Sequence, residues 1–168
     1  FFADHLLLVR QMAQAGITVR AFLGAFGMEF PGVIRELGSS SEGLYGTTAW
    51  QPGVNPGAQD AESRAFIDAY TKRFGGAPVP LSMHGYAAAR ALLAALEAVA
   101  RGGRPVTGET LRDALAAADV TTPLGRVKFD NKGDPLYYER VVVQIQNGRH
   151  VVVYPKARAT APIQLPTR

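Results

Sequence analysis

The chain has 168 residues, of which 47% are hydrophobic and 19% are charged, and it contains no cysteine. The apolar content is enough for a core and excludes global disorder, while the lack of cysteine excludes disulfide bonds and thiolate metal ligands. The formal net charge is +4, and no run of apolar residues approaches the roughly 18 that a membrane-spanning helix needs.

Basic residues are spread along the whole chain, with acidic residues between them. Lys72-Arg73 is the only adjacent basic pair in the sequence. A solvated surface explains such a mixed pattern, and an anionic partner is the alternative. We therefore expect no nucleic-acid partner.

The first fifty residues alternate between helical and strand patterns. Apolar residues at helical spacing predict helices over 4–15 and 31–37. The apolar segments 20–25 and 43–50 predict strands. A helix–strand–helix–strand order is typical of a parallel sheet.

The middle of the chain is rich in helix and poor in strand. Helices are predicted over 59–74, 83–101 and 107–118, and Thr107 is expected to cap the last of them. A turn-rich connection at 51–57, which we interpret as a first crossing between lobes, precedes them, and the passage 75–82 has room for one short strand. Because each helix has an apolar stripe to bury, these helices must cover a sheet, and we infer that this chain lacks most of that sheet.

The last third predicts strands and turns. A crossing between lobes is expected at 121–123, followed by a strand over 125–129. Residues 138–146 alternate in polarity and return through the turn Asn147-Gly148 into 151–154, which predicts an antiparallel hairpin. The tail from Pro155 is proline-rich and is expected to be disordered or loosely docked.

Seven blocks of the sequence keep a characteristic order and spacing. They are LLLVRQMAQAGI (6–17), FLGAFG (22–27), SSEGLYGTT (40–48), AFIDAYTKRFG (65–75), GYAAARALLAAL (85–96), TPLGRVKFDNKGDP (122–135) and VVVQIQNGRHVVVYP (141–155). Together they resemble the periplasmic solute-binding proteins of branched-chain amino acid ABC transporters. The resemblance spans nearly the whole chain and covers only the C-terminal half of such a protein.

This resemblance implies an α/β fold of the type I periplasmic binding class, in which three crossings join two lobes. Residues 1–50 and 122–155 would form part of the C-terminal lobe, with a parallel sheet and the antiparallel hairpin. Residues 51–121 would form the helical part of the N-terminal lobe, and 156–168 a tail.

The function implied is reversible capture of a small solute in an inter-lobe cleft and its delivery to a membrane permease, in the periplasm or another extracytoplasmic space. No catalysis and no cofactor are implied. A ligand-sensing domain of a receptor or regulator with the same fold is the alternative. An α/β enzyme would need an acid–base pair in one pocket, and the sequence indicates none.

Ligands of open α/β sheets lie beyond the carboxyl ends of the strands. For the strand 20–25, these positions are Phe26, Gly27, Met28 and Glu29. In amino acid binders of the family an acid of this loop usually pairs with the ammonium of the ligand, and an ungapped match puts Phe26 there. Since an unpaired buried ammonium is costly, this departure speaks against an α-amino acid ligand. We expect a carboxylate-bearing solute, an amino acid or an aromatic or aliphatic acid, whose apolar body stacks on Phe26.

Each of these assignments has a purely structural alternative. Phe26 can be a core aromatic, and Glu29 can be a solvated acid that complements the dipole of the next helix. Leu81 is expected to form an apolar wall of the site, or simply to pack. His84 is expected to donate to a carboxylate, or to be an exposed or satisfied histidine.

Two further residues are expected at the hinge between the lobes. Trp50 lies at the first crossing, where hinge packing is favoured over ligand contact, and Thr122 lies at the second. A half-protein leaves sheet edges and apolar helix faces uncovered. We therefore expect the chain to pair with another copy or with its missing N-terminal half.

Overall fold

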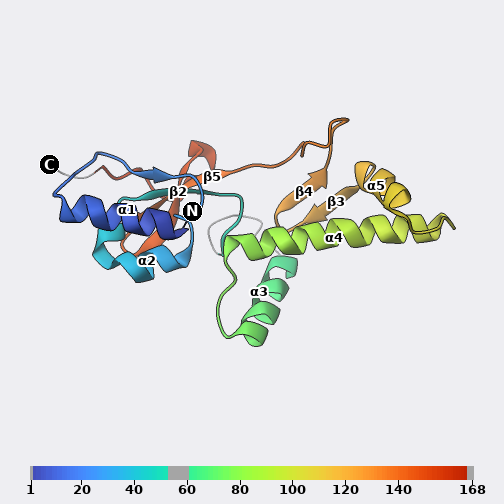
Figure 1. The fold of residues 1–168 in the computed structure, drawn as a ribbon, viewed down its shortest axis with the longest axis horizontal. Helices are drawn as coiled ribbons and strands as arrows, with labels where there is room; N and C mark the ends of the chain where they lie inside the picture. The colour runs from blue at the N-terminus through green and yellow to red at the C-terminus, as the bar shows by residue number, and fades with distance from the viewer. Residues whose placement is uncertain (1, 53–60, 166–168) are drawn as a thin grey trace. The chain divides into compact units, whose positions relative to one another are not determined.

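The computed structural model describes residues 2–52 and 61–165. The chain forms two compact units (Figure 1). Unit 1 comprises Phe1–Asn55 with Arg140–Arg168, and unit 2 comprises Pro56–Glu139. Both contain helices and strands, which confirms the predicted α/β class.

Unit 1 is built on a four-stranded sheet with the order β1-β2-β5-β6. Its elements are α1 (Phe2–Gln14), β1 (Leu23–Gly24), α2 (Pro31–Leu37), the 3-10 helix η1 (Gly38–Ser41), β2 (Tyr45–Thr48), β5 (Val141–Gln146), β6 (Arg149–Tyr154) and the 3-10 helix η3 (Lys156–Arg158). β1 and β2 are parallel, as the alternating helix and strand pattern predicted. β5 is antiparallel to both β2 and β6.

Helices α1 and α2 lie beside each other on one face of this sheet (Figure 1). Their apolar stripes meet a strand residue in one core cluster, which consists of Leu6, Val9, Met28, Val33, Leu37 and Ile145. α2 begins at Pro31 and ends before Gly38, as predicted, because proline suits the first helical turn and Gly38 adopts a positive φ of 53°.

The predicted turn between β5 and β6 is confirmed. Asn147 and Gly148 have φ angles of 53° and 68°, the left-handed conformations that a two-residue hairpin turn requires. Both main-chain N–H groups donate to the Glu42 carboxylate, at 2.9 and 2.6 Å. The loop before β2 therefore holds the hairpin in place.

The tail is docked on unit 1 as far as the structure describes it, rather than disordered. The Thr160 main-chain N–H donates to Val152 O at 2.8 Å. Further along, Gln144 and Gln146 donate to main-chain oxygens of Gln164 and Pro162. Since Ile145 points to the helices, these two glutamines point to the opposite face, where the tail lies.

Unit 2 is dominated by one long helix. Its elements are α3 (Ala61–Phe74), α4 (Pro80–Arg101), α5 (Gly108–Ala116), β3 (Asp119–Thr122) and β4 (Gly125–Lys128). One face of α4 is buried along its length through residues spaced four apart, which are Met83, Ala87, Ala91, Ala95 and Val99. Small side chains on this stripe let neighbouring elements approach closely.

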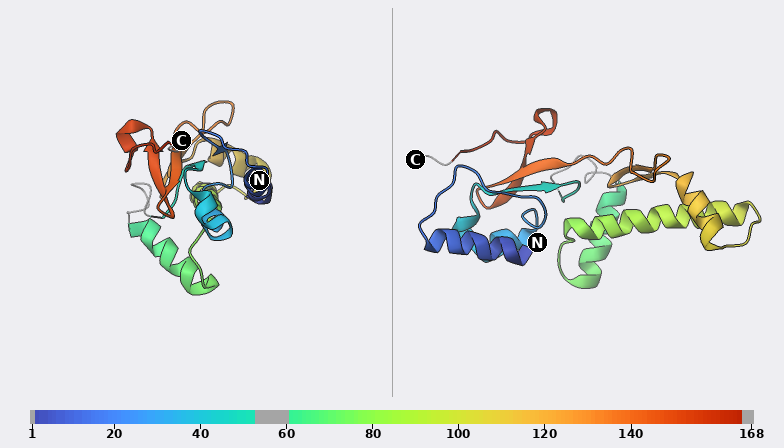
Figure 2. Two further views of the ribbon diagram at one scale, coloured as in Figure 1. Left: turned by 90° about the vertical axis from the view of Figure 1, so that its left-hand side faces the viewer. Right: turned by 45° about the horizontal axis from the view of Figure 1, so that its top comes forward.

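Helices α3 and α5 and the β3–β4 hairpin pack on α4 (Figure 2). α3 contacts it through the rings of Phe66 and Tyr86, whose centroids are 4.9 Å apart, and through Tyr86 Oη, which donates to Glu62 at 2.7 Å. The predicted cap of α5 is confirmed, because Thr107 and Thr110 bond each other's main-chain N–H groups.

The structure differs from the expectations at two places in unit 2. The passage 75–82 forms no strand, because α4 already begins at Pro80. Thr121 and Thr122, which lie at the expected second crossing, belong to β3, which pairs with β4 and packs on α4. The boundary between the two compact units falls between Glu139 and Arg140, and the crossing between lobes expected at 121–123 stays a prediction. The assignment of these units to the two lobes stays a prediction.

Residues 59–60 of the predicted helix 59–74 and residues 53–57 of the predicted connection lie outside the described residues. In the part of the chain that is described, no helix combines the length and hydropathy needed to cross a bilayer.

Candidate functional site

The loop that follows β1, residues 25–30, is the predicted site loop. Because β1 and β2 are parallel, their carboxyl ends lie at the same edge of the sheet, and the loop packs against the end of β2. A Cβ atom at Gly46 would lie only 2.9 Å from the Glu29 nitrogen. Glycine at this position of β2 therefore lets the main chain of the loop approach the strand.

The carboxylate of Glu29 is turned into its own loop. Its Oε2 accepts a hydrogen bond of 2.6 Å from the Gly27 N–H, and the residue is 2% exposed. Gly27 has a φ of 104°, a conformation that side chains rarely adopt. Burial raises the pKa of Glu29, while main-chain hydrogen bonds and the positive charge of Arg140 oppose that rise.

Met28 and Phe26, two further residues of the predicted site loop, make apolar contacts. Met28 is fully buried in the core under α1 and α2. Phe26 is half-buried and makes an edge contact with Phe30, with ring centroids 5.6 Å apart and planes at 72°. The predicted residues Phe26 to Glu29 thus lie in one loop, with Glu29 directed inward.

Arg140 also reaches this edge, although sequence reasoning did not select it. Its Nη2 donates to Thr47 O and Thr47 Oγ1, both at 2.9 Å, and to Ala25 O at 3.4 Å. Thr47 Oγ1 in turn donates to Ala25 O at 2.5 Å. The only signal in the sequence was an arginine placed directly before an apolar strand, and 93 residues separate it from Thr47.

The buried side chain of His150 also contacts the site loop. His150 Nε2 donates to Met28 O at 2.8 Å, because a carbonyl can only accept, and Nδ1 accepts from Gln51 Nε2 at 3.2 Å. Burial lowers the pKa of His150, which favours this neutral form. The imidazole thus connects the site loop, β6 and the segment that follows β2.

Leu81 and His84 lie in the first turns of α4, in unit 2. Leu81 is 52% exposed. His84 Nδ1 donates to Pro80 O at 3.0 Å, so that Nε2 accepts from Tyr138 Oη at 2.9 Å. Both ring nitrogens are therefore engaged within unit 2, and the expected donation to a carboxylate stays a prediction.

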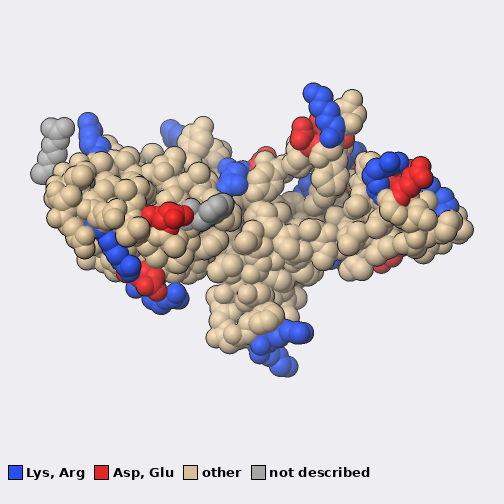
Figure 3. Space-filling model, viewed as in Figure 1, with Lys and Arg blue, Asp and Glu red and all other residues tan. Residues whose placement is uncertain are grey.

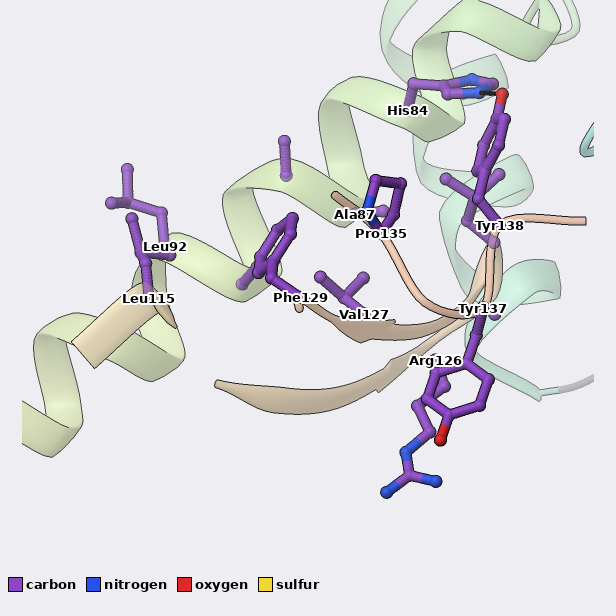
Figure 4. A pocket seen from close by; sticks show the side chains of 14 residues that line it. His84, Ala87, Leu92, Leu115, Arg126, Val127, Phe129, Pro135, Tyr137 and Tyr138 are labelled. Atoms are coloured by element: carbon purple, nitrogen blue, oxygen red, sulfur yellow. Dashed lines mark hydrogen bonds between the residues drawn. The ribbon is translucent and has the colours of Figure 1, made fainter. Parts of the chain in front are cut away.

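His84 lies at one end of an apolar cavity of about 370 Å³ within unit 2 (Figure 4). α4 forms one wall, and the other walls come from α5 and from the chain around β4. The lining side chains include Ala87, Leu92, Leu115, Val127, Phe129 and Tyr137. The hydrogen bond between His84 and Tyr138 supplies the polar end of this cavity.

The two predicted hinge residues are both buried. Trp50 lies two residues after the end of β2, and its main chain exchanges hydrogen bonds with the Thr48 hydroxyl at 2.7 and 3.2 Å. Thr122 closes the turn between β3 and β4, where its hydroxyl donates to Gly125 O at 2.9 Å. Among residues 2–52 and 61–165, no group of three or more His, Asp or Glu side chains is placed to hold a metal ion.

The parallel pair β1–β2, the antiparallel hairpin and the helix-rich unit 2 define a protein of the type I periplasmic binding fold. The family model described as periplasmic binding protein matches residues 1–149. The chain therefore belongs to the periplasmic binding protein family, which is a family of binding proteins rather than of enzymes.

The chain is similar to a curated relative and to two solved structures. The Leu/Ile/Val-binding protein homolog 7 of Brucella abortus is 29% identical over 175 aligned residues, which cover 98% of this chain and 42% of that protein. The structure of the leucine binding protein LivK of Thermotoga maritima matches with a TM-score of 0.72 and 26% identity, over 90% of this chain and 41% of that one.

The third is an ABC transporter solute binding protein of R. palustris in complex with benzoate, with a TM-score of 0.70 and 22% identity over 88% of this chain and 39% of that one. At that identity, the likeness shows the fold alone. The chain spans less than half the length of all three proteins, as its resemblance to one half of such a protein predicted.

Proposed function

We propose that this chain is part of an extracytoplasmic solute-binding protein that captures a small carboxylate-bearing solute and delivers it to the permease of an ABC importer. The observation that carries the proposal is the family match over residues 1–149. The names of the relatives support it, because they describe binders of leucine, isoleucine and valine.

The site loop supports a binding role for unit 1. It lies at the carboxyl ends of two parallel strands, the usual position of ligands in open α/β sheets. Phe26 keeps part of its ring accessible in this loop, and an aromatic face suits an apolar solute body. We expect the solute to bind in the inter-lobe cleft of the complete protein, with Phe26 as one wall.

Calorimetry on the protein that the complete gene encodes tests this function. Leucine, isoleucine, valine, benzoate and phenylacetate form the panel, and we expect at least one of them to bind reversibly without being converted. The matched variants are Phe26→Ala, which removes the proposed wall, and Phe66→Ala, which removes a ring on α3. A panel that gives no binding, or a solute that is chemically converted, would refute the proposal.

Unit 2 has an exposed apolar surface, from which we infer that the chain binds another polypeptide. Large apolar side chains on its helices and loops are 40–63% exposed, namely Phe74, Leu81, Leu92, Leu93, Val106, Leu136, Tyr137 and Tyr138. On the face shown in Figure 3, charged residues form small groups separated by wide uncharged areas. Surfaces of this kind are normally covered.

The occupant that we propose for this surface is the N-terminal half of the same protein, since the relatives are more than twice as long as the chain. In its absence, we expect the chain to associate with further copies. Light scattering over a concentration series tests this, and co-expression with the N-terminal half should replace the self-association by a 1:1 complex. A monodisperse monomer at high concentration would contradict it.

A further inference from the structure

Two charged residues with opposite placements lie at the site loop. Glu29, the one acidic residue between β1 and α2, is buried, and its carboxylate accepts from the Gly27 N–H inside the loop. Arg140 is exposed at the same edge of the sheet. Unit 1 therefore presents a positive charge there, while the negative charge of the loop is turned away from solvent.

The guanidinium of Arg140 is held in a defined position. Nη2 contacts three oxygens that come from the ends of both parallel strands, Ala25 O, Thr47 O and Thr47 Oγ1. Thr47 reinforces the arrangement, because its own hydroxyl donates to Ala25 O. A cation that is anchored in this way loses little side-chain entropy when it binds an anion.

The chemistry of this group selects a ligand. A guanidinium is planar and matches the two oxygens of a carboxylate through parallel N–H donors. Ala25 O belongs to the peptide group between Ala25 and Phe26, so that the main-chain oxygen that accepts from Arg140 is next to the half-buried Phe26 in the sequence. Together they offer a charge for a carboxylate and an aromatic surface for the carbon skeleton.

We infer that Arg140 binds the carboxylate of the solute and that this site selects an apolar organic acid over a zwitterionic amino acid. The inference rests on the proposed function and deepens it by naming the class of solute. A solute ammonium would meet Arg140 with a like charge, while Glu29 is buried and its carboxylate is bonded to the Gly27 N–H inside the loop.

Isothermal calorimetry on the complete protein tests the assignment. The probes are benzoate and phenylacetate as acids, benzamide as an uncharged analogue and leucine as an amino acid. We expect the wild type to prefer the acids, and Arg140→Gln to weaken acid binding about 10–100-fold while benzamide binding stays unchanged. Glutamine keeps a polar side chain without the charge, and thermal unfolding shows whether the variant is folded.

The control variant is Arg149→Gln, which removes the same charge from an exposed position at the start of β6. Its acid affinity should equal that of the wild type. If the wild type binds leucine, and Arg140→Gln binds it as tightly, the inference is overturned and the proposed function stands. If Arg140→Gln lowers only thermal stability and leaves acid affinity intact, Arg140 merely caps the strands. If the wild type binds no probe, the proposed function fails and the inference with it.

Discussion

The side chain of Gln144 on β5 forms two hydrogen bonds with the main chain of Gln164 in the tail. Its Nε2 donates to Gln164 O at 2.6 Å, and its Oε1 accepts from the Gln164 N–H at 2.9 Å. The side-chain amide thus imitates a neighbouring peptide group. Gln144 is fully buried although it is polar, because the tail satisfies it on the outer face of the sheet.

Gln144→Ala is expected to destabilise unit 1 by about 1–3 kcal/mol, since it removes both bonds to the tail as well as the bonds of Gln144 with Gly43 O and Gln146 Nε2. Trp50, the only tryptophan of the chain, lies in unit 1 and reports its unfolding in urea by fluorescence. Gln164→Ala is the matched control, because the bonds use only the main chain of that residue. Equal losses in the two variants would contradict this account of the tail.

Gly46→Ala is expected to displace the site loop. The added methyl group would lie 2.9 Å from the Glu29 nitrogen, a main-chain atom that cannot move alone, and overpacking of this kind costs about 1–3 kcal/mol. The measurement is urea unfolding followed by Trp50 fluorescence, combined with solute affinity in the complete protein. Gly85→Ala in α4, where the methyl group meets nothing within 4 Å, should leave both unchanged or slightly raise stability.

Stability of unit 1 is expected to fall on acidification because of His150. Burial holds its folded pKa below the ordinary 6.5, so its contribution is fully present above pH 6.5 and is lost as the pH falls through the folded pKa. The variant His150→Gln keeps a donor for Met28 O but does not titrate. The unfolding free energy of the wild type should therefore drop more steeply below pH 6.5 than that of the variant. Parallel curves would show that His150 is not responsible.

Glu42→Gln is expected to weaken the β5–β6 hairpin. The carboxylate accepts from two successive main-chain N–H groups, of Asn147 and Gly148, whereas an amide offers one acceptor oxygen and turns an NH₂ group toward the other donor. We expect a loss of about 1–2 kcal/mol and faster amide exchange at these two groups. Glu36→Gln, an exposed acid on α2, should change stability by less than about 0.5 kcal/mol. If the Asn147 and Gly148 amides stay protected from exchange in Glu42→Gln, the Glu42 carboxylate does not hold the hairpin.

Local sequence was sufficient for most elements. Residues 31–37 and the turn at Asn147-Gly148 were predicted at the observed positions, and the cap at Thr107 was predicted as observed. Each depends on residues close in the chain: a proline and a glycine that bound a helix, two residues that tolerate positive φ, and a hydroxyl next to free N–H groups. β3 was missed because Asp119–Thr122 has no apolar alternation of its own and is a strand only in its pairing with β4.

The amino-acid sequence by itself determined the α/β class, the parallel start of unit 1, the closing hairpin and the resemblance to one family, because periodicity, turn residues and block order are properties of neighbouring residues. Only the tertiary structure decided where charges lie at the site loop. Arg140 meets Thr47 across 93 residues, and Glu29 turns inward to Gly27, because the pairing of β2 with β5 and the packing of the loop on Gly46 bring these groups to one edge. No local pattern encodes a contact that exists only once the strands have paired.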